Sequence, residues 1–393
     1  MDTTTRLNDI IINNSDNIAF IIGNGINLRF FKGKVLLWKE LIKRLSSEFL
    51  SDGSNTPDIS LTELFDLIEL DATSNHGIIK EFVEYAQSNK IDLRTALSYI
   101  KSVDSDEIQK LINGFRNGLT IVKRTSFESF RKLYFEFLNG CRKWCMNTRD
   151  DGESLTDSQC VEHFMDFANN PTKIRVMKNI VKNKVAQTYT LNLSDPNLTK
   201  LMFFFRNLET PVLTTNYDSL LSQSLHLSKY KMGKSFTAFY PWNIYQSDKK
   251  LECPISGFGI WHINGMVDYP LSIKLGLSDY MGNVERTRKM LQSHDFNEFF
   301  NGKNQNDWLG YNTWLHIFFS KDLFVFGLKL ESDEVFFRWL LIQRAKYSHM
   351  YNKKLKGWFV DKEICEGDKY FLKKVGFDVI EISEFDELYN SFR

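Results

Sequence analysis

Five short apolar runs are the feature of this sequence that most constrains its fold. Each run has four or five residues, and most are followed by Gly, Asn or Asp. Runs of this length and composition are typical of parallel strands that are covered on both faces of a sheet. The five runs are Ile18–Ile22, Val212–Thr215, Leu323–Phe326, Gly357–Val360 and Val379–Ile382.

Amphipathic helical stretches follow the first three runs. Leu37–Phe49 follows the first run, Ser219–Leu227 the second, and Glu334–Lys346 the third. Strands that alternate with helices in this way are typical of open parallel sheets. The sequence therefore predicts an α/β protein, with a Rossmann-like parallel sheet that is flanked by helices.

The region between residues 60 and 208 has a different pattern, because helical periodicity dominates it and few runs resemble strands. We predict that residues 60–208 form a large helical insertion subdomain. The Rossmann-type domain would then consist of residues 1–59 and 209–393. Little sequence follows the last expected strand, so we expect no separate C-terminal sensor domain.

Charge and cysteine content narrow the possible environments. Fifty basic residues balance forty-nine acidic residues. Proteins that bind nucleic acid usually carry an excess of clustered basic residues, so we predict no direct binding to nucleic acid. Five scattered cysteines are typical of a reducing compartment, and Cys141 and Cys145 lack the CxxC spacing of a zinc site. We find no signal peptide and no apolar run of the ~20 residues that a membrane span needs. These features predict a cytoplasmic protein with no metal and no membrane contact.

A glycine pair follows the first apolar run. Gly23, Asn24 and Gly25 stand between this run and a helical stretch, where glycines let the backbone approach a pyrophosphate. Leu28 occupies the position of the third glycine of GxGxxG, and the acidic residue of a dehydrogenase is missing. Taken alone, the motif fits a tight structural turn equally well.

Polar residues follow the second run, in the segment Thr214–Asp218. Ligands of open α/β sheets bind outside the carboxyl ends of the strands, so these side chains are placed for chemistry. The alternative is that Asn216 or Asp218 simply caps the helix expected from Ser219.

Two further positions resemble functional junctions. His262 stands between an apolar segment and the glycine turn at Gly265, and a neutral imidazole can act as a general base near physiological pH. A buried, hydrogen-bonded structural histidine is the alternative. Gly327 ends the third apolar run, where it could also be an ordinary turn between a strand and a helix.

Together these motifs resemble the sirtuin family, and in particular the divergent sirtuin-like domains of bacterial antiviral defence. Gly23–Asn27 resembles the GAGxS phosphate loop of the family, and Trp38–Leu41 resembles a W-x-E-L stretch that follows it. Thr214–Asp218 is similar to the TQNID motif, in the TTNYD form of the bacterial group.

The resemblance continues along the chain. His262–Gly265 resembles the catalytic HG segment, and Asp279 with Tyr280 matches the downstream DY pair of the divergent group. Gly327 corresponds to a later nucleotide loop, in which Lys329 replaces the serine of the family. The helical insertion is not covered by the resemblance.

The resemblance implies NAD+ as the substrate and assigns roles to residues. Asn216 and His262 would be catalytic, with Asn216 holding a water or the ribose hydroxyls and His262 accepting a proton. The residues that would bind the dinucleotide are Gly23, Asn24, Gly25, Asn27, Thr215, Asp218 and Gly327.

Departures from the deacetylating sirtuins indicate which reaction to expect. Those enzymes carry a four-cysteine zinc module and a GIP-x-FR segment, whereas this sequence has no CxxC pair, and Arg29–Phe31 does not reproduce the FR segment. Without the peptide-binding module, water is the expected acceptor. The resemblance thus implies an NAD+ hydrolase that releases nicotinamide and ADP-ribose.

The resemblance also implies a biological role, as an effector of anti-phage defence that depletes NAD+. A homo-oligomer is expected. The trigger would act through the helical insertion, through oligomer assembly, or through a partner such as a companion ATPase or a phage protein. Two alternatives stay open. One is a non-enzymatic module that senses NAD+ or ADP-ribose and assembles with a partner, and the other is a protein deacylase without zinc.

Overall fold

The computed structural model describes residues 2–35, 38–49, 60, 62–67, 70, 159, 174–303, 307–330 and 334–393. The chain divides into two compact units, Met1–Leu37 with Lys182–Arg393, and Trp38–Val181. Most of the expected insertion at residues 60–208, including Cys141 and Cys145, lies outside the described residues. Among the residues described, no helix is long and apolar enough to cross a membrane.

The second unit contains α3 (Trp38–Phe49), in which Leu41 and Leu45 are buried. The chain passes from this unit to the first within α9 (Ile174–Tyr189). The first unit then continues with α10 (Pro196–Asn207), which Asp195 caps by accepting from the backbone N–H groups of two residues in its first turn. Within residues 60–208, the described helices α9 and α10 agree with the helical periodicity of the sequence, and the bounds of the insertion stay a prediction.

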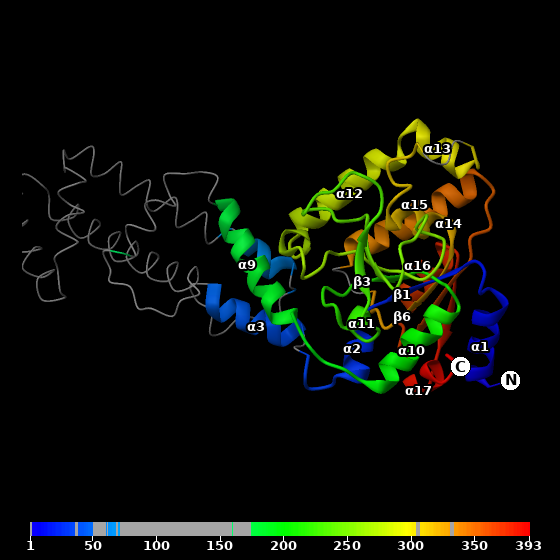
Figure 1. Ribbon diagram of the computed structural model, residues 1–393, viewed down its shortest axis with the longest axis horizontal. Coiled ribbons are helices and arrows are strands. Elements are labelled where there is room, and N and C mark those ends of the chain that lie inside the picture. The colour runs from blue at the N-terminus through cyan, green and yellow to red at the C-terminus, as the bar shows by residue number, and fades with distance from the viewer. Residues whose placement is uncertain are drawn as a thin grey trace, which may run out of the picture. The chain divides into compact units, whose positions relative to one another are not determined.

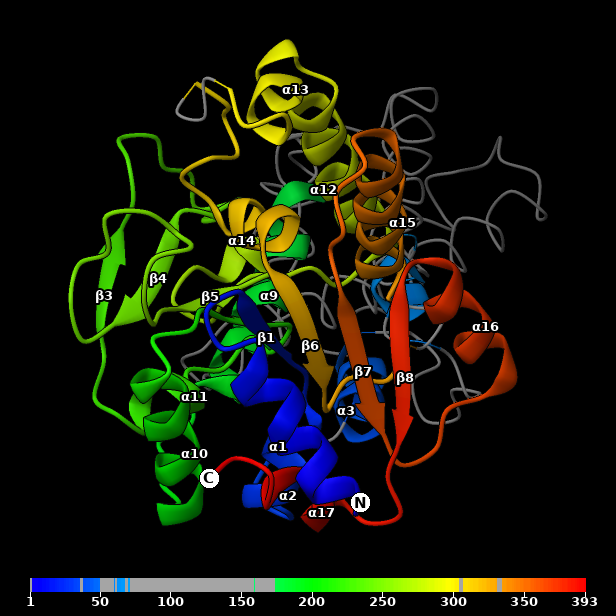
Figure 2. The ribbon, with the colours of Figure 1, turned by 90° about the vertical axis from the view of Figure 1, so that its right-hand side faces the viewer.

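An eight-stranded sheet forms the centre of the first unit, in the order β3-β4-β5-β2-β1-β6-β7-β8 (Figure 2). The strands are β1 (Ile18–Ile22), β2 (Val212–Thr214), β3 (Ser228–Lys231), β4 (Ile244–Ser247), β5 (Ile260–His262), β6 (Asp322–Phe326), β7 (Gly357–Asp361) and β8 (Phe377–Glu381).

The six strands from β5 to β8 in this order pair in parallel, and only β3 and β4 at one edge are antiparallel. Numbered along the chain, the parallel strands stand in the order 3-2-1-4-5-6 of the Rossmann fold. The direction in which strands are added reverses between β1 and β6. The α/β fold with a Rossmann-like parallel sheet is confirmed.

Helices cover both faces of the sheet (Figure 1). One face packs against α12 (Leu277–Leu291), α13 (His294–Phe300), α14 (Trp314–Ser320), α15 (Val335–Met350) and α16 (Glu366–Lys374). The other face carries α1 (Thr3–Asn13), α10 and α17 (Phe385–Tyr389). Both faces are apolar because successive side chains of each buried strand point to opposite sides.

The structure shortens one expected helix, whereas the helix expected at Leu37–Phe49 is present as α3. The helix expected at Ser219–Leu227 is only α11 (Leu220–Gln223), because the chain turns at His226, whose φ is +51°. The helix that directly follows β1 is α2 (Gly25–Phe30), whereas α3 belongs to the second unit. A short junction after β1 and β2 keeps the polar segments there close to the sheet.

Phe20 is expected to be a large contributor to stability. Its fully buried ring in β1 contacts the rings of Phe205, Phe324 and Phe392. We predict that Phe20→Ala lowers the free energy of unfolding by about 3–5 kcal/mol, because it removes a ring from a packed core. Urea denaturation followed by circular dichroism measures the change.

Phe385→Ala is the control, since that ring is 41% exposed and its loss should cost less than about 1 kcal/mol. Equal losses of stability in the two variants would contradict this account of the packing.

Candidate functional site

Four segments that follow neighbouring strands meet at one edge of the sheet. Ile22 of β1 pairs with Thr214 of β2 on one side and with Phe326 of β6 on the other. Thr214 in turn pairs with His262 of β5. These four residues form one row across adjacent parallel strands, so the segments that leave them lie side by side. Ligands of such sheets bind at this edge, where the strand order reverses.

The loops after β1 and β6 touch through their glycines. The Gly23 N–H donates to the Phe326 carbonyl at 3.1 Å, and the Gly25 N–H donates to the Gly327 carbonyl at 2.8 Å. A Cβ on Gly23 would lie 2.4 Å from the Gly327 oxygen, and one on Gly25 would lie 2.7 Å from the Gly327 Cα. Gly327 also has a φ of +63°, which favours glycine.

This contact gives the glycine pair a structural reason that the sequence analysis left open. The N–H groups of Gly23 and Gly25 already donate to the neighbouring loop. These glycines can therefore leave space for a ligand, but they have no free N–H group to donate to it. Because these glycines have no side chains, the backbones of the two loops can lie close together at the edge of the sheet. Asn24 and Asn27 are the polar side chains that this junction provides.

Asn27 and Asp218 link the junctions after β1 and β2. The Asn27 amide donates to the Asp218 carboxylate at 2.7 Å and to the Asn24 side-chain oxygen at 3.1 Å. The other carboxylate oxygen of Asp218 accepts from the Leu220 N–H at 3.0 Å. Asp218 therefore accepts from the first residue of α11, whose N-cap residue is Ser219, and also holds Asn27. Burial raises the pKa of the Asp218 carboxyl above its ordinary value.

Asn216 and His262 are in direct contact. The imidazole Nδ1 lies 2.8 Å from the Asn216 backbone carbonyl. A carbonyl oxygen only accepts, so Nδ1 carries the hydrogen, and Nε2 is left as the proton acceptor of a neutral ring. Burial lowers the pKa of His262 below its ordinary value. The imidazole is therefore neutral and correctly protonated to act as a base at neutral pH.

Asn216 is held from two further directions. Its N–H bonds to the Thr214 hydroxyl at 3.1 Å, and that hydroxyl donates to the Ile22 carbonyl at 2.9 Å. The Asn216 side-chain amide lies 3.4 Å from the Gly23 carbonyl, a weak bond that a ligand could replace. Thr215 is anchored through its N–H to the Ile22 carbonyl at 3.2 Å.

The structure thus brings most of the expected site residues into three contacting groups. The first is Gly23, Gly25 and Gly327, the second is Asn24, Asn27 and Asp218, and the third is Asn216 and His262. Lys329, which replaces the serine of the nucleotide loop, is exposed. Residues 331–333 lie outside the described part of the chain.

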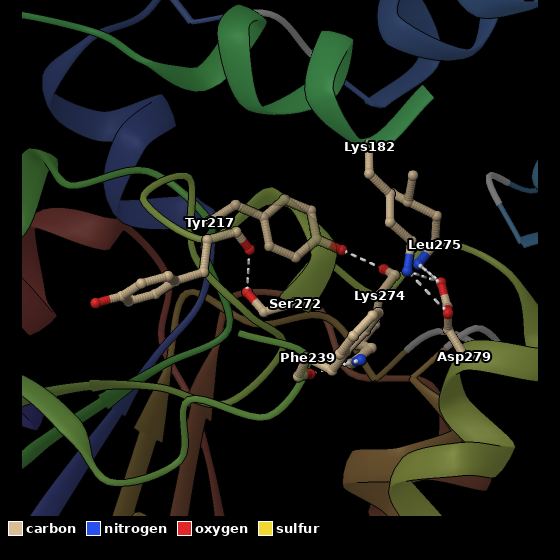
Figure 3. A network of polar contacts seen from close by, with 8 residues as sticks. Lys182, Tyr217, Phe239, Ser272, Lys274, Leu275 and Asp279 are labelled. Atoms are coloured by element: carbon tan, nitrogen blue, oxygen red, sulfur yellow. Dashed lines mark hydrogen bonds and ion pairs between the residues drawn. The ribbon is translucent and has the colours of Figure 1, made fainter. Parts of the chain in front are cut away.

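A polar network that no sequence motif connects lies beside these groups (Figure 3). Lys182 of α9 forms an ion pair with Asp279 at 2.8 Å, although the two residues are 97 positions apart. The buried Lys274 side chain lies nearby and donates to the Phe239 carbonyl at 3.2 Å. The DY motif pointed to Asp279, but no spacing in the sequence connects it with Lys182 or Lys274.

Within the part of the chain that is described, no group of three or more His, Cys, Asp or Glu side chains is arranged to hold a metal ion.

The fold and its four adjoining junctions define a Rossmann-like α/β protein whose polar residues gather at the switch point of the sheet. Comparison with known families matches residues 210–378 to the SIR2-like domain. The chain therefore contains a SIR2-like domain, and this family indicates NAD-related chemistry. The match covers Thr215, Asn216, Asp218, His262 and Gly327. No curated protein matches the chain.

Gly23→Ala should disturb the contact between the two glycine loops. Because the added Cβ would meet the Gly327 backbone at 2.4 Å, we predict that the variant loses about 1–3 kcal/mol of unfolding free energy. Urea denaturation checks this loss.

Gly367→Ala is the matched control, because its Cβ would meet nothing closer than the Cys365 sulfur at 4.0 Å. That substitution lies in α16 and should leave stability unchanged or raise it by up to about 1 kcal/mol. A Gly23→Ala protein as stable as the parent would show that the loops do not require the glycine.

Proposed function

We propose that this chain hydrolyses NAD+ at the bond between nicotinamide and ribose, releasing nicotinamide and ADP-ribose. The observation that carries the proposal is the contact between His262 and Asn216 at the switch-point edge of a SIR2-like domain. Both residues stand at the carboxyl ends of neighbouring strands, β5 and β2, where ligands of this fold bind.

The chemistry requires little from the protein beyond position. When the nicotinamide–ribose bond breaks, both electrons go to the ring nitrogen, and the cationic nicotinamide leaves as a neutral molecule. Water then forms a bond to the ribose carbon and loses a proton, which His262 accepts through Nε2. Asn216 orients this water or the ribose hydroxyls, and such placement can supply a large part of the rate.

The dinucleotide is proposed to lie across the reversal of strand order. The pyrophosphate would lie on the surface formed by Gly23, Gly25 and Gly327, with Gly327 on the adenosine side. Asn24 and Asn27 would face it. Thr215 and Asp218 adjoin the nicotinamide end. The buried Asn27 side-chain oxygen supports this placement, because it has no hydrogen-bond partner among the residues described, and an unpaired buried acceptor is costly.

The biological role follows from the resemblance to the defence-associated group. We propose that the protein acts in the bacterial cytoplasm as a homo-oligomer and depletes NAD+ during phage infection, when a companion ATPase or a phage protein triggers it. Measuring cellular NAD+ in infected bacteria that express the chain, or its His262→Ala variant, tests this role. A fall in NAD+ that is equal with the two chains would contradict it.

His262→Ala and Asn216→Ala should each lower nicotinamide release from NAD+ at least about 100-fold, the low end of what a positioned base contributes. Chromatographic detection of nicotinamide and ADP-ribose from the purified protein, with and without infected-cell extract, measures the change.

His316→Ala is the matched control. Its imidazole is also buried and also bonds a backbone carbonyl, that of Tyr311 at 2.9 Å, but it lies in α14, which precedes the amino end of β6. Activity should survive in this variant as long as it folds. Full activity of His262→Ala would refute the proposed base. Binding of NAD+ without release of nicotinamide would favour a sensing module, and formation of acetyl-ADP-ribose with an acetyl-lysine peptide would favour a deacylase.

The pH dependence of nicotinamide release should show the lowered pKa of His262. Only the neutral imidazole accepts a proton, and burial keeps it neutral to a lower pH than usual. The rate should therefore fall with acid only below the ordinary histidine pKa of about 6.5. Initial rates between pH 5 and 8, at saturating NAD+, check this expectation. An acid midpoint above 6.5 would be inconsistent with it.

A further inference from the structure

A closed ring of bonds connects the two proposed catalytic residues. His262 bonds through Nδ1 to the Asn216 carbonyl at 2.8 Å. The next residue, Tyr217, donates its hydroxyl to the Lys274 carbonyl at 2.6 Å. The Lys274 N–H donates to the Asn264 carbonyl at 3.1 Å. Because Asn264 is two residues beyond His262, the backbone completes the ring.

The far side of this ring is buried. Tyr217 and Lys274 are each 4% exposed, and the hydroxyl-to-carbonyl bond between them is short (Figure 3). Removing the hydroxyl would leave the Lys274 carbonyl without this donor in a place from which water is excluded, which is unfavourable. The bond therefore restrains the segment that carries Asn216 relative to the segment that carries His262.

The Lys274 side chain extends the ring to the segment between β3 and β4, which consists of residues 232–243. Its ammonium donates to the Phe239 carbonyl at 3.2 Å and lies 4.6 Å from the centre of the Tyr240 ring. Arg286 of α12 lies 5.1 Å from the centre of the same ring. A cation near an aromatic ring is attracted to it, so the charge of Lys274 helps to hold this segment.

Lys274 shares its surroundings with other charged and titratable groups. Lys182 of α9 pairs with Asp279 of α12 at 2.8 Å, and Asp279 also accepts from the Leu275 N–H at 3.3 Å. Burial, with the charge of Lys182, lowers the pKa of Lys274 to about 8, while Asp279 opposes the change. The other charged and titratable groups around this network are Arg286, Glu285, Glu334, Tyr189, Tyr217, Tyr240 and Tyr280.

We propose that Tyr217 and Lys274 are positioning residues for the proposed reaction. The Tyr217 hydroxyl fixes the position of Asn216 relative to His262. The Lys274 ammonium holds residues 232–243 against this ring of hydrogen bonds. This inference rests on the proposed function, because it assigns the ring a task in nicotinamide release.

Tyr217→Phe tests the hydroxyl. We expect kcat for nicotinamide release to fall by about 10- to 100-fold, the size of effect that a misplaced group produces, with KM changed less than about twofold. In nitrogen NMR spectra, the Nδ1 proton of His262 should exchange faster with water than in the parent protein.

Tyr347→Phe is the control, since the buried Tyr347 hydroxyl also donates to a backbone carbonyl, that of Leu291 at 2.8 Å. If the two variants have the same kcat and the same His262 proton exchange, the positioning role of Tyr217 is overturned. The exchange measurement needs no turnover. A parent protein that releases no nicotinamide would therefore refute the proposed function, and the restraint on His262 would still be tested.

Lys274 is tested by the pH profile. In the parent protein, kcat should decline above about pH 8, as Lys274 loses its charge. Lys274→Arg, which stays charged in this range, should remove this decline, and Lys274→Met should be slow at every pH between 7 and 9. Lys321→Met is the control, because Lys321 also donates to a backbone carbonyl, that of Asp16 at 2.9 Å. If Lys274→Met keeps the parent rate and the parent decline, the role of Lys274 is refuted.

Discussion

The contact between the glycines of two loops, after β1 and after β6, is the constraint on which the rest of this site depends. β1 and β6 are neighbouring parallel strands, so the loops that follow them leave the sheet at the same edge and lie against each other. Gly23, Gly25 and Gly327 allow backbone to meet backbone there. A bulkier residue at Gly23 or Gly25 would push the loops apart and move Asn24 and Asn27 with them.

Polar bonds across β2 transmit this arrangement to the proposed catalytic pair. Asp218 joins Asn27 to the start of α11, and the Thr214 hydroxyl joins Asn216 to the end of β1. Burial favours the neutral forms of both Asp218 and His262. The neutral imidazole of His262 still offers a proton acceptor, which is what the proposed hydrolysis requires.

Sequence patterns predicted the elements whose signal is local. Five strands stood out because short continuous apolar runs are typical of strands in a parallel sheet. β3 was missed because three of its four residues are exposed at an edge. The expected helix after β2 was too long, since packing of α11 and the left-handed turn at His226 end it early.

By itself, the sequence determined the α/β class and the polar segments at Gly23, Asn216 and His262, because strand ends and glycine turns depend on residues that are adjacent in the chain. Only the tertiary structure decided which of these segments touch, since the order of strands in a sheet depends on packing between distant parts of the chain. It also decided the dual use of Asp218, the tautomer of His262 and the neighbours of Lys274. These depend on hydrogen bonds and burial that no spacing along the chain encodes.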